Sequence, residues 1–373
     1  MAESTRLVDL VQGAIDSFLA ERAAEFSTIA PELLQFTDAA SAFLAGGKRF
    51  RALFCYWGWQ SVRGAGDGFD PLPDEDVSAD LPGIVQAAAA LEMFHAAALV
   101  HDDIMDRSDT RRGALSAHRR FEESHRRAGW VGDAAQFGES AALLLGDLLL
   151  GWSDELFDRG TGLLAARGAG LAGRAEFARM RTEVTAGQYL DILEEHSWVA
   201  HPEADALPRA HRVIVYKSAK YSVEAPLAIG GALGGASLAQ LDALREFGLP
   251  LGIAYQLRDD LLGVFGDPAV TGKPAGDDLR EGKRTVLIAL ARQTLPTAAR
   301  NVLDELLGEP ELDVQQVEMI RTALRECGAV DRVESIIGSN VQQARAAIAD
   351  APLAPSARAQ LIELAGTVTR RVA

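Results

Sequence analysis

Cysteine is scarce in this chain of 373 residues, which carries only Cys55 and Cys327. Two cysteines exclude a disulfide-built scaffold and a four-cysteine zinc site, and they fit a reducing compartment. The segment Met1–Phe26 also lacks the basic region, apolar run and small-residue cleavage site of a signal peptide. We therefore expect a cytoplasmic protein.

The chain also has few positively charged residues relative to negatively charged ones, and it has no long apolar run. The chain has 37 Lys and Arg against 53 Asp and Glu, a formal net charge of −16. This balance argues against a nucleic-acid partner, although a small phosphorylated ligand needs only a few placed cations. The densest apolar stretch, Ala141–Trp152, is interrupted by Asp147. Because no 18 consecutive residues are apolar and uncharged, we expect no membrane-spanning helix.

Strand-type alternation is nearly absent, and the nearest candidate, Val213–Val215, is too short to build a sheet. Hydrophobic residues make up 48% of the chain, enough for a large core. They recur at the spacing of three and four that is typical of helices. The segments with this spacing are Leu7–Leu19, Ala52–Val62, Ile84–Met105, Ala141–Phe157, Phe177–Leu193, Leu238–Leu262 and Val286–Ala291. The sequence predicts an all-α protein.

Gly and Pro are concentrated in three segments, which we predict to be connections between helices. These segments are Arg63–Pro82, Arg159–Gly173 and Gly263–Gly282. The first reads as a polar loop or insertion, the second as a flexible link, and the third as a charged loop. No repeat of fixed period and few shifts in composition appear. We therefore expect a single domain over residues 1–373.

The sharpest motif is a group of three aspartates, Asp102, Asp103 and Asp106. On a helix, Asp102 and Asp106 share one face, because they are four residues apart. They follow the almost wholly apolar segment Gly83–Val100, where clustered carboxylates would repel one another without a cation. Mg²⁺ prefers such oxygen ligands, and Arg111 and Arg112 could then hold phosphate oxygens. The alternative is a solvated helix end.

A second acidic pair, Asp259 and Asp260, again ends an apolar segment, Leu249–Leu257. Lys273 and Lys283 follow in the Gly-rich loop. Two helices that both end in Asp-Asp and lead to cations predict a cavity with carboxylates on facing walls. Such carboxylates could bridge several Mg²⁺ ions around one diphosphate. The alternative is a charged loop in solvent.

Further cations lie upstream and between these pairs. In Gly46–Arg51, Lys48 and Arg51 are expected one turn apart at a helix start, a ready site for an anion. His95 lies two turns before Asp102, and Lys217 lies in a helical stretch. Taken singly, each has an ordinary structural explanation: a capped helix with surface charges, or a core histidine.

As a set, these residues resemble the trans-isoprenyl diphosphate synthases, or polyprenyl synthetase family, and most of all a bacterial geranylgeranyl diphosphate synthase. The resemblance runs from about Gly46 to Thr285. Matching motif residues are Lys48, Arg51, His95, Asp102, Asp103, Asp106, Arg111, Arg112, Lys217, Gln256, Asp259, Asp260, Lys273 and Lys283. Ser218 replaces the family's threonine. Gly263 replaces the third aspartate of the second motif, for which Asp267 could substitute.

The resemblance implies an antiparallel all-α bundle of the isoprenoid synthase type with a central cavity, a core over about 40–295 and an insertion at about 63–82. It implies a homodimer with three Mg²⁺ per site. The implied metal ligands are Asp102, Asp106 and Asp259. An allylic prenyl diphosphate would bind Arg111, Lys217, Ser218, Gln256, Lys273 and Lys283. Isopentenyl diphosphate would bind Lys48, Arg51, His95 and Arg112. The residues implied in catalysis are Asp102, Asp103, Asp106, Arg111, Lys217, Asp259 and Asp260.

Product length is expected to depend on the residues that precede Asp102. In the family, bulky aromatics at the positions of Ala97 and Ala98 stop growth at C15, so small residues leave that level open. Phe94 lies one helical turn beyond Ala98, and one turn rises by about the length of an isoprene unit. This favours geranylgeranyl diphosphate, C20. If Phe94 is ordinary core packing, longer products follow.

Three other functions stay open from the residues alone. A terpene cyclase would share the first motif but would need no second diphosphate site. A non-catalytic subunit would be expected to have lost an aspartate motif, and Gly263 leaves this open. A helical scaffold would leave unexplained why carboxylates and cations recur at the ends of apolar helices.

Overall fold

The computed structural model describes residues 2–64, 75–111, 113–266 and 276–369. The chain divides into two compact units: Met1–Arg174 with Ile229–Gly235, and Ala175–Ala228 with Ala236–Ala373. The prediction of one domain over 1–373, with a core at about 40–295, stays a prediction. Two helices, α7 (Arg167–Ser197) and α9 (Ala225–Leu233), run through the divisions between the units.

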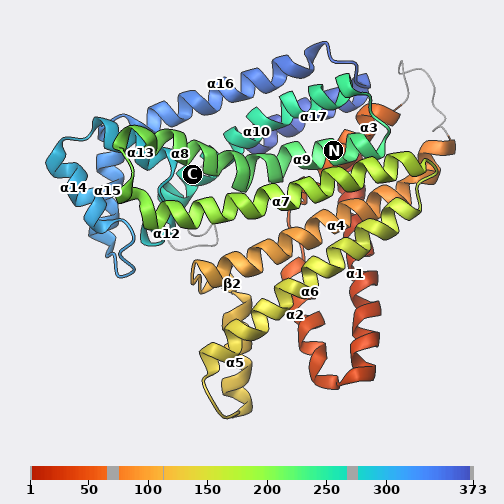
Figure 1. The fold of residues 1–373 in the computed structure, drawn as a ribbon, viewed down its shortest axis with the longest axis horizontal. Helices are drawn as coiled ribbons and strands as arrows, with labels where there is room; N and C mark the ends of the chain where they lie inside the picture. Colours follow the sequence, from red (N-terminus) through yellow and green to blue (C-terminus); the bar gives the residue numbers. More distant parts are fainter. Residues whose placement is uncertain (1, 65–74, 112, 267–275, 370–373) are drawn as a thin grey trace. The chain divides into compact units, whose positions relative to one another are not determined.

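Where the structure describes it, the first unit consists of helices and one two-stranded hairpin (Figure 1). Its elements are α1 (Ala2–Ile29), η1 (Pro31–Leu33), α2 (Leu34–Leu44), α3 (Phe50–Arg63), α4 (Glu75–Met105), β1 (Thr110–Arg111), β2 (Ala114–Leu115), α5 (Ala117–Ala128) and α6 (Ala134–Gly162). The antiparallel hairpin pairs Thr110 with Leu115 and Arg111 with Ala114.

Helix α4 is the centre of the first unit, since α1, α2, α3, α5 and α6 all pack against it. Its part Ala79–Met105 is long and apolar enough to cross a membrane, but 78% of the most apolar window is buried inside the protein. It is the only such helix among the described residues. Burial of this kind is typical of a core helix, whose apolar faces are covered by neighbouring helices.

The second unit is also helical. Its elements after α7 are η2 (Trp198–Ala200), η3 (Glu203–Asp205), α8 (Ala206–Val213), the π-helix η4 (Ile214–Glu224), α9, α10 (Leu238–Phe265), α12 (Asp277–Arg280), α13 (Val286–Thr294), α14 (Thr297–Leu306), α15 (Val314–Glu326), α16 (Ala329–Ala349) and α17 (Pro355–Thr369). Ser237 and Gln240 form a capping box at the start of α10.

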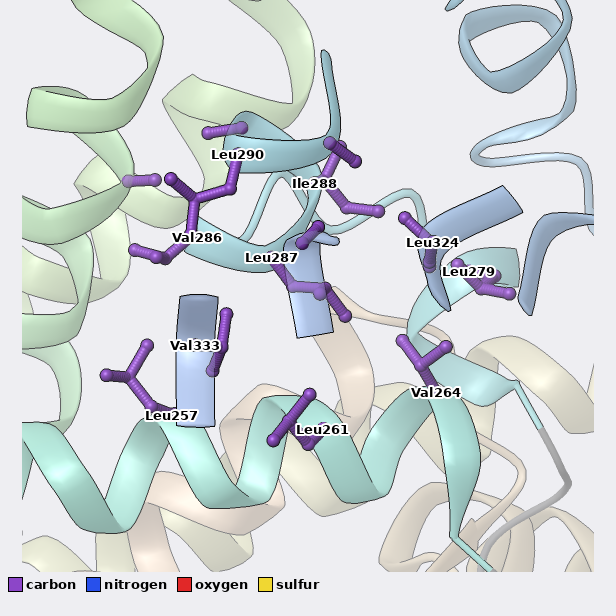
Figure 2. Packing of buried hydrophobic residues seen from close by; sticks show 14 of the residues in the cluster. Leu257, Leu261, Val264, Leu279, Val286, Leu287, Ile288, Leu290, Leu324 and Val333 are labelled. Carbon is purple, nitrogen blue, oxygen red and sulfur yellow. The ribbon is translucent and has the colours of Figure 1, made fainter. Parts of the chain in front are cut away.

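The core of the second unit gathers on α10. Figure 2 shows Leu257, Leu261 and Val264 of α10 beneath the short helix α13 and beside Leu279 of α12. Leu279 is 1% exposed, and this burial anchors a helix of only four residues. The last turns of α10, which carry Asp259 and Asp260, are therefore fixed by apolar packing on one side.

The predicted helices are confirmed. All seven segments with helical spacing lie inside helices, namely α1, α3, α4, α6, α7, α10 and α13. Val213–Val215 is helical as well, because it ends α8 and begins η4. The pattern did not reveal the shorter and more polar helices, such as α5 and α12.

All three predicted connections are wrong in part. The third, Gly263–Gly282, contains the last residues of α10 and the whole of α12. Arg159–Gly173 is mostly helix, since α6 ends at Gly162 and α7 begins at Arg167. Its glycines serve close packing: a side chain at Gly160 would meet the Gly83 carbonyl oxygen of α4 at 2.7 Å. Within Arg63–Pro82, α4 already begins at Glu75 and continues through Pro82. Residues 65–74 of that loop lie outside the described residues.

Candidate active site

The first aspartate motif lies at the C-terminal end of α4. The Asp106 N–H donates to the Asp102 carbonyl oxygen at 2.8 Å, so the helical turn continues through Asp106. Asp102 and Asp106 are both half-buried, as expected for neighbours on one helix face, whereas Asp103 is completely buried. Asp103 therefore differs from Asp102 and Asp106 in its burial.

Arg111 holds the buried member of this motif. Its Nε donates to Asp103 Oδ1 at 2.8 Å, and its Nη2 contacts both Asp103 and, at 3.4 Å, Asp102. The hairpin β1–β2 positions Arg111, with Gly113 at φ 76° in its turn. Burying the charge of Asp103 is tolerated because the guanidinium pairs with it. Arg112 lies outside the described residues.

The cationic loop before α3 has a constrained backbone. Gly46, Gly47 and Arg49 have φ values of 68°, 95° and 49°. For the non-glycine Arg49 this left-handed conformation costs free energy, and tertiary contacts must hold it. The expectation that Lys48 and Arg51 share a helix is wrong, because α3 begins at Phe50. Lys48 is exposed in the loop, and Arg51 is half-buried in the first turn.

Arg49 and Glu92 provide those tertiary contacts. Arg49, 5% exposed, donates from Nη1 to Glu92 Oε2 at 3.3 Å, and its Nη2 contacts Gln12 and the Leu44 carbonyl oxygen. Glu92 Oε1 also accepts the Ala52 N–H at 3.2 Å, in the first turn of α3. This carboxylate from α4 thereby replaces the missing N-cap side chain of α3.

This contact brings three predicted residues into one region of the first unit. His95, half-buried, lies three positions after Glu92 and so one turn further along α4. The loop that carries Lys48 and leads into Arg51 of α3 is bound to the preceding turn of α4 through Arg49. Neither Arg49 nor Glu92 was a predicted site residue. The run Gly46–Arg51 contains Arg49, but nothing in the sequence marks Glu92 as its partner.

The residues expected to control product length lie on the same helix. Phe94 is 4% exposed, Ala97 is fully buried and Ala98 is half-buried. Phe94, Ala98 and Asp102 keep the spacing of four that places them along one stripe of α4.

The second aspartate pair lies near the end of α10, in the second unit. Asp260 is 5% exposed, and Gln256 donates from Nε2 to its Oδ1 at 2.8 Å. Burial foremost, and then the charges of Asp278 and Asp259, raise the pKa of Asp260 to about 8 against the lowering effects of Gln256 and Lys283. Gln256 thus contacts an aspartate of the motif. Lys273 and Asp267 lie outside the described residues.

Lys217 and Ser218 lie in the π-helix η4, and both are half-buried. Lys217 pairs with Asp191 of α7, which sequence reasoning missed because a single acid on an amphipathic helix carries no signal. One turn before Asp191, a side chain at Gly187 would meet the Lys217 backbone nitrogen at 2.3 Å. The two helices touch there through their backbones. A π-helix of this length is rare, and short π segments often mark functional sites.

Lys283 lies beside the second aspartate pair. Its Nζ contacts Glu281 Oε2 at 2.6 Å, and its charge lowers the pKa of Asp260. Of the predicted cations described in the second unit, Lys283 therefore acts on the aspartate pair near the end of α10, whereas Lys217 pairs with Asp191.

The donor set suits magnesium. Asp260 Oδ2 is buried and has no hydrogen-bond partner, an arrangement that a bound cation would compensate. The surrounding groups are carboxylates, the ligands that Mg²⁺ prefers. Among the described residues, no three His, Cys, Asp or Glu side chains form a ready-made metal cage. Mg²⁺ commonly binds through one or two carboxylates, with substrate phosphates and water completing its shell.

Comparisons with known proteins place the chain in a family. The polyprenyl synthetase pattern matches residues 34–324. A solved geranylgeranyl pyrophosphate synthase from Corynebacterium glutamicum, complexed with isoprenyl diphosphate and magnesium, is 36% identical, with 98% of this chain and 99% of that chain covered and a TM-score of 0.89.

Curated relatives carry different product names. A nonaprenyl diphosphate synthase of Mycobacterium tuberculosis is 31% identical, over 88% of this chain and 84% of its own length. A geranylfarnesyl diphosphate synthase of Aeropyrum pernix is 28% identical, over 91% of this chain and 94% of its own length. The all-α fold class is confirmed, and the chain belongs to the polyprenyl synthetase family of trans-prenyltransferases.

Proposed function

We propose that this chain condenses isopentenyl diphosphate with an allylic prenyl diphosphate in a Mg²⁺-dependent reaction. The observation that carries the proposal is the ion pair of Arg49 with Glu92, which attaches the Lys48 loop and the first turn of α3, with Arg51, to α4. Glu92 precedes Asp102 by ten residues, or about 15 Å along the helix. Helix α4 thus carries a pair of carboxylates and also holds a cationic loop. The loop suits a diphosphate that binds directly, and the carboxylates suit a second diphosphate that binds through metal ions.

The carboxylates bind the allylic substrate through its metal ions. Asp102, Asp106 and Asp259 are the proposed ligands, and Asp103 positions Arg111. When bound, Mg²⁺ stabilises the negative charge that develops on the departing diphosphate. Cations, one amide and one hydroxyl group of the chain contribute to the same binding. They are Arg111, Lys217, Ser218, Gln256, Lys273 and Lys283.

Isopentenyl diphosphate binds the other cationic group. Lys48, Arg51 and Arg112 are the proposed ligands of its diphosphate, together with His95 of α4. The allylic C–O bond breaks, the double bond of isopentenyl diphosphate attacks the allylic carbon, and a proton leaves. The products are inorganic diphosphate and an allylic diphosphate longer by one isoprene unit. The apolar surface of α4 keeps water from the allylic cation.

We propose geranylgeranyl diphosphate as the main product. Ala97 and Ala98 leave room one turn before Asp102, and the buried ring of Phe94 limits the chain one turn further. The named relatives include synthases of longer products, so a C25 or longer product is the main alternative, with C15 the other. Product analysis decides among these.

Two further properties belong to this proposal. We expect a homodimer, because Leu143 and Leu144 of α6 are 51% and 55% exposed and suit an apolar interface. We also expect a cytoplasmic enzyme, which agrees with two free cysteines. Light scattering after gel filtration tests the dimer, and fractionation of the producing cells tests the location.

The function is tested by incubating the purified chain with Mg²⁺, isopentenyl diphosphate and each allylic starter in turn. Mass spectrometry should show a C20 diphosphate. A hydrocarbon formed without isopentenyl diphosphate would indicate a cyclase, and no product from any starter would indicate a non-catalytic subunit. Asp102→Asn should abolish turnover with the circular dichroism spectrum retained. The matched control is Asp158→Asn on α6, whose side chain is 62% exposed.

A further inference from the structure

Position 263 is where the second aspartate motif departs from the family pattern. Gly263 lies one turn after Asp259 on α10, where the family has a third aspartate. A Cβ atom at Gly263 would lie 1.9 Å from Oδ2, 2.3 Å from Cγ and 2.8 Å from Oδ1 of Asp278. The carboxylate of Asp278 therefore occupies the space in which a side chain at position 263 would begin.

The backbone around Asp278 is fixed from both sides. Gly276 starts α12 at φ 73°, and Leu279 is buried beside Val264 in the core shown in Figure 2. The Lys283 N–H donates to the Asp278 carbonyl oxygen at 3.1 Å. These contacts hold the backbone of Asp278 where its carboxylate meets Gly263 of α10.

The surroundings of Asp278 point to a cation. Asp260, more than nine-tenths buried, has an Oδ2 atom without a hydrogen-bond partner. Asp259 is the preceding residue on α10, and the Asp278 carboxylate lies against Gly263, about one turn further along the same helix. Three carboxylates with one buried, unpartnered oxygen are costly unless a positive ion joins them.

We propose that Asp278, from α12, supplies the third carboxylate of the second aspartate motif and binds, with Asp259, a divalent cation that carries a diphosphate. The inference rests on the proposed function for the identity of that ligand. It replaces Asp267 as the substitute for the missing aspartate. If Asp278 binds the cation, Lys283 is held near the same site. Lys283 follows Asp278 by only five residues, and its N–H donates to the Asp278 carbonyl oxygen.

The test measures cation binding and does not depend on turnover. Mn²⁺ affinity is measured by electron paramagnetic resonance on the full chain, in the presence of inorganic pyrophosphate. Asp278→Asn should weaken binding by about tenfold or more. The controls are Asp277→Asn, one residue earlier on α12, and Asp267→Asn, and both should bind as the unmodified chain does.

A second pair of variants tests the geometry. Gly263→Ala places a methyl group against the Asp278 carboxylate and should weaken Mn²⁺ binding as Asp278→Asn does. Gly263→Asp combined with Asp278→Gly moves the carboxylate onto α10 and should restore affinity to within about threefold of the unmodified chain. Circular dichroism verifies folding of each variant.

The outcomes separate this inference from the proposed function. Unchanged Mn²⁺ affinity in Asp278→Asn, or loss confined to Asp267→Asn, overturns the inference even if the chain makes prenyl diphosphates. The inference is also overturned if the folded double variant Gly263→Asp, Asp278→Gly binds Mn²⁺ as weakly as Asp278→Asn does. If the unmodified chain makes no prenyl product but needs Asp278 for Mn²⁺ and pyrophosphate, the proposed function fails and the inference stands.

Discussion

Arg49 and Glu92 form a buried ion pair that joins the loop before α3 to the middle of α4. Glu92 has a double role, because its second oxygen also accepts the Ala52 N–H in the first turn of α3. The pair therefore holds the strained backbone of Arg49 and the start of α3 together. Lys48 and Arg51, on either side of Arg49, receive their positions from it.

Breaking this pair should impair binding of isopentenyl diphosphate. Arg49→Lys keeps the charge but loses the fork that reaches Glu92 and Leu44 together. We expect KM for isopentenyl diphosphate to rise about tenfold while kcat and KM for the allylic substrate change less than about threefold. Steady-state kinetics with each substrate varied in turn provides the measurement.

Gln12→Ala is the matched control for Arg49→Lys, since it removes a single contact of Arg49. We expect its kinetics to be near normal. Glu92→Gln leaves the buried guanidinium without its counter-charge and should lower the free energy of unfolding by about 3–5 kcal/mol. A folded Arg49→Lys enzyme with unchanged KM values would show that the pair serves stability alone.

Phe94→Ala should lengthen the product. Removing the ring opens the stripe that runs through Ala98 toward Asp102, so growth should continue past C20. Chromatography of dephosphorylated products measures the distribution. The neighbouring Met93→Ala is the control, because Met93 is also fully buried but lies on a different face of α4. If both variants lengthen the product equally, or if Phe94→Ala leaves product length unchanged, Phe94 does not control chain length.

Glu224→Gln should stabilise the protein at neutral pH. Glu224 is 7% exposed and its Oε2 has no hydrogen-bond partner. Burial above all raises its pKa, with charged neighbours adding smaller effects of both signs. These neighbours are Lys220, Glu183, Arg179 and Arg245. Since the folded pKa exceeds the unfolded value, the charge opposes folding once pH rises above about 4.5.

The gain from Glu224→Gln should be about 1 kcal/mol at pH 7 and should shrink toward zero as pH falls to 4. Urea unfolding at a series of pH values measures it. The exposed Glu246 of α10 supplies the control variant Glu246→Gln, which should leave stability nearly unchanged. A stabilisation by Glu224→Gln that does not depend on pH would contradict the electrostatic explanation.

Cys55 should resist alkylation in the folded protein. Complete burial raises the pKa of its thiol from 9.0 to about 12, so almost none is thiolate at pH 8. Cys327 is half-buried and should react first with iodoacetamide. Peptide mass spectrometry after timed quenching gives both rates. Comparable rates for Cys55 and Cys327 in folded protein would refute the burial of Cys55. Unfolding in urea should make Cys55 reactive.

The sequence alone determined the long helices and predicted candidate residues for the site. Apolar spacing over many turns outweighs local exceptions, so segments such as Ile84–Met105 could be assigned without coordinates. Asp102 and Asp106 were paired correctly because residues four apart on a helix are neighbours. Short or polar helices such as α12 were missed, since they are stabilised by tertiary packing and leave little periodic signal.

Only the tertiary structure decided which side chains pair across elements. Arg49 with Glu92, Lys217 with Asp191, and Asp278 against Gly263 each join residues that are 15 to 43 positions apart. No local pattern encodes such distances, because they follow from how whole helices pack. The sequence thus predicted the kinds of groups in the candidate site, and helix packing determined which side chains hold them in place.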